Sequence, residues 1–155
     1  MMPSAKLKAM AKGRMSELMI RVRAGGLTPE GYQALAHAVG WERRTEAQAR
    51  DLIINARHSV SAWQSDDEKV LIGMGRATGI GTQYAHLADI AVLPGFQGAG
   101  VGTAIIGHLL ALVDRETHID ATVTLHAAPG TDAFYGRFGF QSSGTPGLMT
   151  RNRAD

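Results

Sequence analysis

Hydrophobic positions in the middle of this chain follow patterns that predict strands and a buried helix. Apolar runs separated by turn residues predict an antiparallel meander of three strands over residues 59–64, 70–78 and 83–92. A broad apolar face over residues 100–114 predicts a helix, and residues 121–127 predict another strand. A strand, a helix and a strand in succession predict a right-handed crossover that joins a parallel pair.

The flanking segments add shorter elements. Thr28 followed by Pro29 predicts the start of a helix that reaches about Val39, and Thr45 predicts the cap of a second helix. Further elements are expected over residues 18–22 (a strand), 131–137 (a short helix) and from residue 140 onward (one or two closing strands). The sum is a mixed sheet flanked by helices, which is an α/β fold.

The composition is that of a globular protein, with 45% hydrophobic and 19% charged residues. The chain has no cysteine, which excludes a disulfide framework, a cysteine-based zinc site and a thiol nucleophile. The lack of cysteine suits a reducing compartment, and we therefore expect a cytoplasmic protein.

Basic residues concentrate at the beginning of the chain. Residues 1–14 carry four basic side chains and no acid, so the remainder is slightly negative although the whole chain has a net charge of +2. The body of the chain therefore gives no reason to expect a nucleic-acid partner. We expect residues 1–16 to form a basic leader, as a weak helix or disordered, and residues 17–153 to form the domain.

An uncharged run over residues 90–113 is long enough to be weighed as a membrane span. It contains Pro94, Gln97, His108 and five glycines, so it is better explained as a buried strand, a glycine loop and a buried helix. We therefore expect no membrane partner.

The glycine loop lies between the predicted strand over residues 83–92 and the predicted helix over residues 100–114. Glycines leave main-chain N–H groups uncovered, and a helix N-terminus adds oriented N–H groups and a positive dipole end. Such a segment is suited to a phosphate or pyrophosphate. It meets the pattern Q/R-x-x-G-x-G/A in full, through Gln97, Gly100 and Gly102.

Two other nucleotide-binding patterns fail in this segment. The Walker pattern requires a lysine where His108 stands. The dinucleotide fingerprint requires a third glycine where Thr103 or Ile105 stands, depending on which glycine begins the pattern.

A second motif, Phe134-Tyr135-Gly136-Arg137-Phe138-Gly139-Phe140, follows the glycine loop. With these two motifs, and with the strand end Ala91-Val92-Leu93-Pro94, the chain resembles the GNAT superfamily of acetyl-CoA-dependent N-acetyltransferases over roughly residues 18–151. The resemblance implies a single domain with a mixed, mostly antiparallel sheet of six or seven strands flanked by about four helices.

The same resemblance implies acetyl-CoA as the co-substrate, and no metal. Main-chain groups of Ile90, Ala91 and Val92 would pair with the pantetheine arm, where the strands over residues 83–92 and 121–127 splay apart. Phe134 would lie beside the cofactor. The pyrophosphate would be held by the N–H groups of Gln97, Gly98, Ala99, Gly100, Val101 and Gly102, with Thr103 at the helix start.

Three side chains are candidates for the chemistry. Tyr135 matches the family's tyrosine general acid, and packing on the helix is its alternative role. His86 matches the first of two histidines that serve the proton path in arylalkylamine N-acetyltransferases, but Ala88 replaces the second, and a hydrogen-bonded sheet histidine is the alternative. Asp89 matches one acid of a pair in glucosamine-phosphate and polyamine acetyltransferases. It would hold a cationic substrate amine or tie a neighbouring loop, and strand alternation places it opposite His86.

We therefore expect an N-acetyltransferase that moves the acetyl group of acetyl-CoA to the primary amine of a small molecule, by direct attack through a tetrahedral intermediate. A protein or peptide N-acetyltransferase and a non-catalytic acyl-CoA-binding sensor stay open as alternatives. A homodimer is an alternative to a monomer, because many members of the family are dimers. Tyr32, Trp41 and Trp63 would line a substrate pocket or pack in the core.

Overall fold

The computed structural model describes the backbone of residues 5–11 and 14–154 and the side chains from residue 19 to residue 154. Within these ranges one sheet has eight strands, in the order β1-β2-β3-β4-β5-β6-β8-β7. Neighbouring strands are antiparallel except β5 and β6, which are parallel. The strands are β1 (Ala5–Ala11), β2 (Arg14–Ala24), β3 (His58–Trp63), β4 (Leu71–Thr78), β5 (Tyr84–Val92), β6 (Thr122–His126), β7 (Gln141–Ser142) and β8 (Leu148–Asn152).

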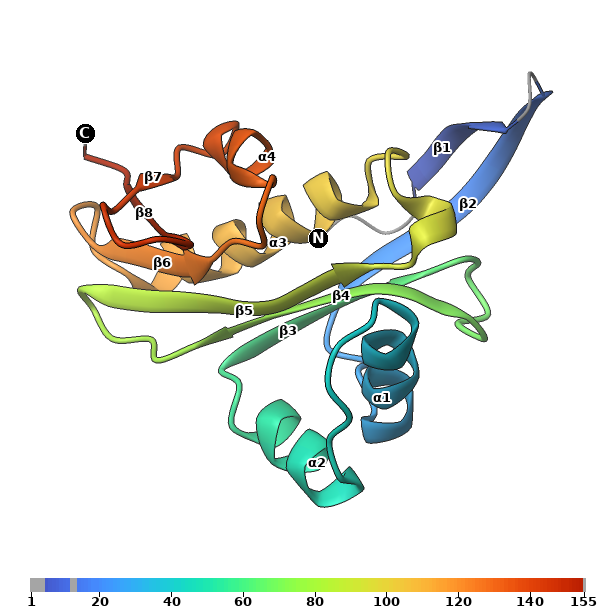
Figure 1. Ribbon diagram of the computed structural model, residues 1–155, viewed down its shortest axis with the longest axis horizontal. Coiled ribbons are helices and arrows are strands. Elements are labelled where there is room, and N and C mark those ends of the chain that lie inside the picture. The colour runs from blue at the N-terminus through green and yellow to red at the C-terminus, as the bar shows by residue number, and fades with distance from the viewer. Residues whose placement is uncertain (1–4, 12–13, 155) are drawn as a thin grey trace.

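Helices cover both faces of the sheet. Helix α3 connects β5 to β6 and lies on one face together with α4, whereas α1 and α2 lie on the opposite face (Figure 1). The helices are α1 (Pro29–Ala38), α2 (Glu46–Ile54), α3 (Val101–Glu116) and α4 (Asp132–Gly136), and a short 3-10 helix, η1 (Pro94–Phe96), follows β5. The α/β fold class with a mixed sheet and one parallel pair is confirmed.

The N-terminal segment differs from the expectation. Residues 5–11 were expected in a weak helix or disordered, but they form β1, which pairs antiparallel with β2 from Ala5↔Ile20 to Ala11↔Arg14. This strand is additional to the six or seven expected. Residues 1–4 and 12–13 of the leader lie outside the described residues, and the start of the domain at residue 17 stays a prediction.

The two helices on the second face begin where the sequence predicts. Thr28 Oγ1 accepts a hydrogen bond from the N–H of Gly31 at 3.0 Å, and Pro29 occupies the first turn of α1. Thr45 and Gln48 form a reciprocal capping box at the start of α2. These caps satisfy N–H groups that would otherwise lack a partner at the helix ends.

The core has two parts, one on each face. Helix α3 buries Ile105, Ile106 and Leu109 against the sheet. It approaches β4 so closely that a Cβ added at Gly73 or Gly75 would lie 2.7 Å from a methyl group of Ile105 or Leu109. On the other face, α1 and α2 pack over a smaller cluster made of Leu27, Tyr32, Leu35, Ala36, Ala49, Met74 and Ala91. In the described part of the chain, no helix combines the length and apolar character needed to span a membrane.

Candidate active site

A cleft of about 490 Å³ lies where β5, the N-terminus of α3 and α4 meet. It brings the two sequence motifs together, although they are separated by the whole of α3 and β6. Its walls are Ile90, Ala91, Val92, Gln97, Gly98, Gly100, Gly102, Thr103, Thr131, Phe134, Tyr135 and Arg137. Of the predicted cofactor residues, Ala99 and Val101 are absent from these walls, and Val101 is buried in the core beneath α3.

The loop between β5 and α3 is shaped by glycines. Gly98 and Gly100 have φ angles of 82° and 87°, in the left-handed region, where a residue with a side chain would be strained. Gly100 is the N-cap of α3 and offers no side-chain cap. The side-chain amide of Gln97 donates to the carbonyl of Val92 at 3.0 Å, so it does not cap α3. The first N–H groups of a sixteen-residue helix therefore meet the cleft without a capping side chain, which suits an anion.

Gly102 is the contact between the two motifs. A Cβ added at this position would lie 3.2 Å from Cζ of Phe134, so the ring packs against the bare backbone of α3. Phe134 also makes edge contacts with the rings of Tyr135, at 5.0 Å, and Phe138, at 5.6 Å. The guanidinium of Arg137 lies 5.9 Å from the centroid of the Phe134 ring.

Tyr135 reaches the same cleft from α4 and is only 8% exposed. Its ring also contacts Phe140, at 6.3 Å between centroids. Burial raises the pKa of its phenol above the ordinary value, because the charged phenolate would lose its hydration. The hydroxyl therefore stays protonated at neutral pH and can act as a proton donor.

Strand β5 extends beyond its parallel neighbour. The pairing with β6 runs from Tyr84↔Thr122 to Leu87↔Leu125, and β6 ends at His126. Residues 88–92 of β5 therefore lie past the paired segment, and Ile90, Ala91 and Val92 among them line the cleft. A chain-like ligand can add to such an edge through main-chain hydrogen bonds.

A bulge in β5 changes the position expected for Asp89. Asp89 has a φ angle of 54°, and the register with β4 moves from Ala88↔Arg76 to Ala91↔Met74, so one extra residue lies in β5. Strict alternation would place Asp89 on the face opposite His86. The bulge instead turns its carboxylate toward α1 and α2, and that expectation of opposite faces was wrong.

The carboxylate of Asp89 is engaged within the protein. Its Oδ2 accepts from Arg76 Nε at 2.7 Å and from the Tyr32 hydroxyl at 2.8 Å. Arg76 also donates to the carbonyl of Leu52 in α2, at 3.2 Å. Desolvation, and then the hydrogen bond to Asp89, raise the pKa of Tyr32 to about 12. Asp89 thus ties β5 to β4 and α1, and it also borders a second cavity near residues 41–48.

His86 lies on the same face as Asp89, outside the cofactor cleft. Its Nδ1 is 2.7 Å from Thr124 Oγ1, and its ring makes an edge contact with His126 at 5.6 Å between centroids. Burial, followed by the nearby His126 and Arg76, lowers the pKa of His86 below its ordinary value. His86 is therefore neutral at pH 7 and able to accept a proton. His126, which contacts His86, is exposed to solvent.

Some residues of the two cavities were not predicted from the sequence. Arg137 and Thr131 line the cleft. Arg137 belongs to the second motif, and this membership could have indicated that it lies in the cleft. Nothing in the sequence indicated Arg76, because its contact with Asp89 depends on the register of β4 against β5. Of the aromatic candidates, Tyr32 is fully buried and Trp63 is nearly so, whereas Trp41 borders the second cavity. Within the described residues, no group of three or more His, Asp or Glu side chains is arranged to hold a metal ion.

Proteins of similar sequence and structure carry acetyltransferase names. A histone acetyltransferase from Glycine max is 33% identical over 135 residues, covering 81% of this chain and 57% of the relative. A chloroplastic serotonin N-acetyltransferase from Oryza sativa is 30% identical over 125 residues, covering 78% of this chain and 60% of the relative. The chain thus spans about three fifths of the length of these curated relatives.

A solved structure is similar over nearly its whole length. It is a probable acetyltransferase of unknown function from meticillin-resistant Staphylococcus aureus, with a TM-score of 0.75 and 31% identity. The similarity covers 82% of this chain and 93% of the solved one.

The relatives correct the expected cytoplasmic location. The serotonin N-acetyltransferase from Oryza sativa and an N-acetyltransferase from Arabidopsis thaliana are both named chloroplastic. The names of these relatives contradict the expectation of a cytoplasmic protein. The expectation failed because a chain without cysteine is compatible with any compartment and does not distinguish one from another.

The family of this chain is assigned by a match over most of its length. The sequence pattern of the acetyltransferase (GNAT) family matches residues 28–140, a span that contains the glycine loop, the bulged part of β5 and Tyr135. Members of this family are acyltransferases that generally use acetyl-CoA. The chain therefore belongs to the GNAT family of acetyltransferases.

Proposed function

We propose that this enzyme transfers the acetyl group of acetyl-CoA to the primary amine of a small molecule, by direct attack through a tetrahedral intermediate. The observation that carries the proposal is the cleft in which Gly102 packs on Phe134, so that the glycine loop and Tyr135 share one cavity. A general acid and an anion site are thereby held on the same side of β5.

The co-substrate is bound mainly by main-chain groups in this proposal. N–H groups of the loop over residues 97–102 hold the pyrophosphate, with Thr103 beside them in the first turn of α3. Residues 90–92 pair with the pantetheine arm along the free part of β5. A main-chain N–H at the bulge faces the carbonyl oxygen of the thioester and stabilises the charge that develops there.

Proton transfers are assigned to two side chains on opposite faces of the sheet. Tyr135 donates a proton to the departing thiolate, because its raised pKa keeps the hydroxyl protonated. An alkyl amine has a pKa near 10.4, so roughly 0.1% or less is neutral at pH 7 and a proton acceptor is useful. His86, directly or through water, accepts that proton and passes it toward His126.

A protein or peptide acceptor is the second candidate. It is supported by the relative from Glycine max that is named a histone acetyltransferase. The relative from Oryza sativa that is named a serotonin N-acetyltransferase supports a small amine instead.

The test combines binding and turnover. Thermal shift with acetyl-CoA measures binding, and thiol release against a panel of small amines and lysine peptides measures transfer. We expect stabilisation by acetyl-CoA and release with at least one small amine. Absence of any stabilisation would contradict the whole proposal. Binding without turnover on any acceptor would favour the acyl-CoA sensor, and turnover confined to peptides would favour the second candidate.

A further inference from the structure

A second cavity, of about 440 Å³, lies on the α1 and α2 face of the sheet. It is lined by Trp41, Glu42, Arg43, Arg44, Gln48 and Asp89. Asp89 is followed directly by Ile90, which lines the cofactor cleft. The cavity and the cofactor cleft therefore approach the bulge of β5 from different sides, which is the arrangement needed for an acceptor to meet a thioester.

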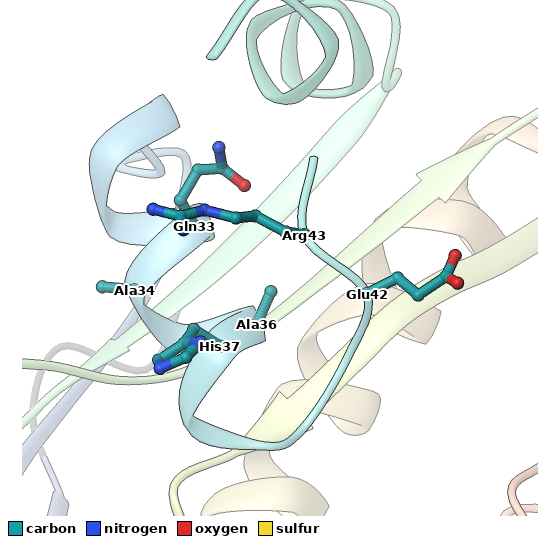
Figure 2. Close-up of a pocket in the computed structure, with 6 residues that line it drawn as sticks. All are labelled: Gln33, Ala34, Ala36, His37, Glu42 and Arg43. Carbon is teal, nitrogen blue, oxygen red and sulfur yellow. The ribbon is translucent and has the colours of Figure 1, made fainter. Parts of the chain in front are cut away.

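A third cavity, of about 320 Å³, continues along the loop after α1 (Figure 2). It shares Glu42 and Arg43 with the second cavity and adds Gln33 and His37 of α1. We call these two cavities together the loop groove. Figure 2 shows that Glu42 and Arg43 leave the loop in opposite directions, with Arg43 lying toward Gln33.

The loop that forms this groove is held in place. The side-chain amide of Gln33 donates to the carbonyl of Arg44. The N–H of Trp41 donates to the carbonyl of Ala36 at 3.0 Å, and α2 begins directly after the loop with its capping box at Thr45. The two arginines are therefore presented by a fixed backbone.

Positive charge exceeds negative charge in the groove, where the two guanidinium groups of Arg43 and Arg44 face the carboxylates of Glu42 and Asp89. Arg76 already neutralises Asp89, through a contact whose two side chains are 8% and 15% exposed. Among the described side chains, neither Arg43 nor Arg44 forms an ion pair with a carboxylate. Arg44 lies close enough to lower the pKa of Tyr32, the residue that donates to Asp89. With Asp89 neutralised by Arg76, Glu42 is the remaining carboxylate of the groove, and the two guanidinium groups exceed it by one positive charge.

We propose that the acceptor is a primary amine that also carries an anionic group, a carboxylate or a phosphate, and that Arg43 and Arg44 bind this group. The inference rests on the proposed acetyl transfer and names the class of its acceptor. Guanidinium groups suit both anions, because they form paired, charge-assisted hydrogen bonds. Trp41, which is partly exposed, covers the apolar body of the acceptor, and the amine lies toward Asp89 and the bulge.

The same charge disfavours a lysine-rich peptide. A cationic chain laid along the loop groove would place its positive charges beside Arg43 and Arg44, and like charges repel when they are brought together. The groove therefore selects against basic peptide acceptors and in favour of small zwitterionic amines.

Matched pairs of amines test the proposal by direct binding. Calorimetry on the CoA-saturated enzyme compares phosphoethanolamine with ethanolamine, and γ-aminobutyrate with butylamine. Saturation with CoA prevents the phosphate from occupying the cofactor site. We expect the member of at least one pair that carries the anionic group to bind about tenfold or more tightly than its counterpart without that group. The pair that responds distinguishes a phosphate from a carboxylate.

Variants assign the effect to the two arginines. In Arg43→Ala/Arg44→Ala the preference for the amine with the anionic group should disappear, whereas CoA affinity stays unchanged and the amine without that group binds no more weakly than before. Arg115→Ala is the matched control, because Arg115 is an exposed arginine at the end of α3, on the other face of the sheet, and it should keep the preference.

Three outcomes would overturn the inference: equal affinity within both pairs, failure of all four amines to bind, or tighter binding of a lysine-rich peptide than of any anionic amine. Loss of the preference in Arg115→Ala as well would show a general charge effect and would also contradict it. Failure of the proposed function is distinguishable, since it would appear as absence of acetyl-CoA binding in the wild-type enzyme.

Discussion

Gly102 and Phe134 touch across the cofactor cleft, since a Cβ added to Gly102 would lie 3.2 Å from Cζ of the phenyl ring. The first residue belongs to the glycine loop motif and the second to the motif that contains Tyr135. Their contact holds the start of α3 against α4, and it fixes the distance between the anion site and the proton donor.

We predict that Gly102→Val weakens acetyl-CoA binding by about tenfold or more, because the added methyl groups displace the Phe134 ring or enter the cleft. The affinity is measured by calorimetry. Gly107→Val is the matched control, since it lies in the same helix with nothing within 4 Å of its added Cβ. Equal affinities of the two variants for acetyl-CoA would show that the contact between Gly102 and Phe134 does not matter for binding.

Tyr135→Phe should lower kcat by about 10²-fold or more, because the thiolate would leave without a proton donor. Acetyl-CoA affinity and folding stability should change little, since the ring and its contacts with Phe134 and Phe140 remain. Thiol release at saturating substrate measures the effect. Tyr84→Phe, which changes an exposed tyrosine at the start of β5, is the control. Near-normal turnover of Tyr135→Phe would assign this tyrosine to packing alone.

The lowered pKa of His86 predicts a pH dependence. Above about pH 6.5 the imidazole is neutral and can accept a proton, and as the pH falls through its lowered pKa the imidazole becomes charged and kcat/KM should fall. His86→Gln should lose this inflection and about tenfold or more in rate. His118→Gln, at an exposed turn after α3, should keep both. An unchanged pH profile in His86→Gln would exclude the proton path proposed here.

The ion pair between Asp89 and Arg76 predicts a stability effect. Asp89→Ala should lower the free energy of unfolding by about 3 kcal/mol, because it leaves the guanidinium of Arg76 buried without its counter-charge. Chemical denaturation measures this change. Asp120→Ala, in an exposed turn, should change the stability by much less. A small loss of stability together with a large rise in KM for the amine would assign Asp89 to substrate binding instead.

The sequence was sufficient for features that depend on local patterns. The caps at Thr28 and Thr45 mark both helix starts, and the glycine spacing from Gly98 to Gly102 marks the anion loop, because backbone geometry at these positions follows from nearby residues. Element boundaries agree to within about three residues for most strands and helices, with β2 beginning earlier than expected.

Features that depend on pairing between distant segments could not be predicted. The bulge at Asp89 reverses the expected face of that side chain, and alternation along one strand carries no signal for it. The contact of His86 with His126 joins β5 to β6 and requires the parallel register to be known. The pairing of Arg76 with Asp89 likewise depends on the register of β4 against β5.

We propose above all that main-chain N–H groups between Gln97 and Gly102 hold acetyl-CoA. The most direct measurement is an NMR titration of backbone amides with acetyl-CoA. We predict saturable shifts that are largest for the amides of residues 97–102 and for residues 90–92, with little change at Arg43 and Arg44. Absence of saturable shifts in the loop amides, or shifts confined to another surface, would show that this loop is not the acetyl-CoA site.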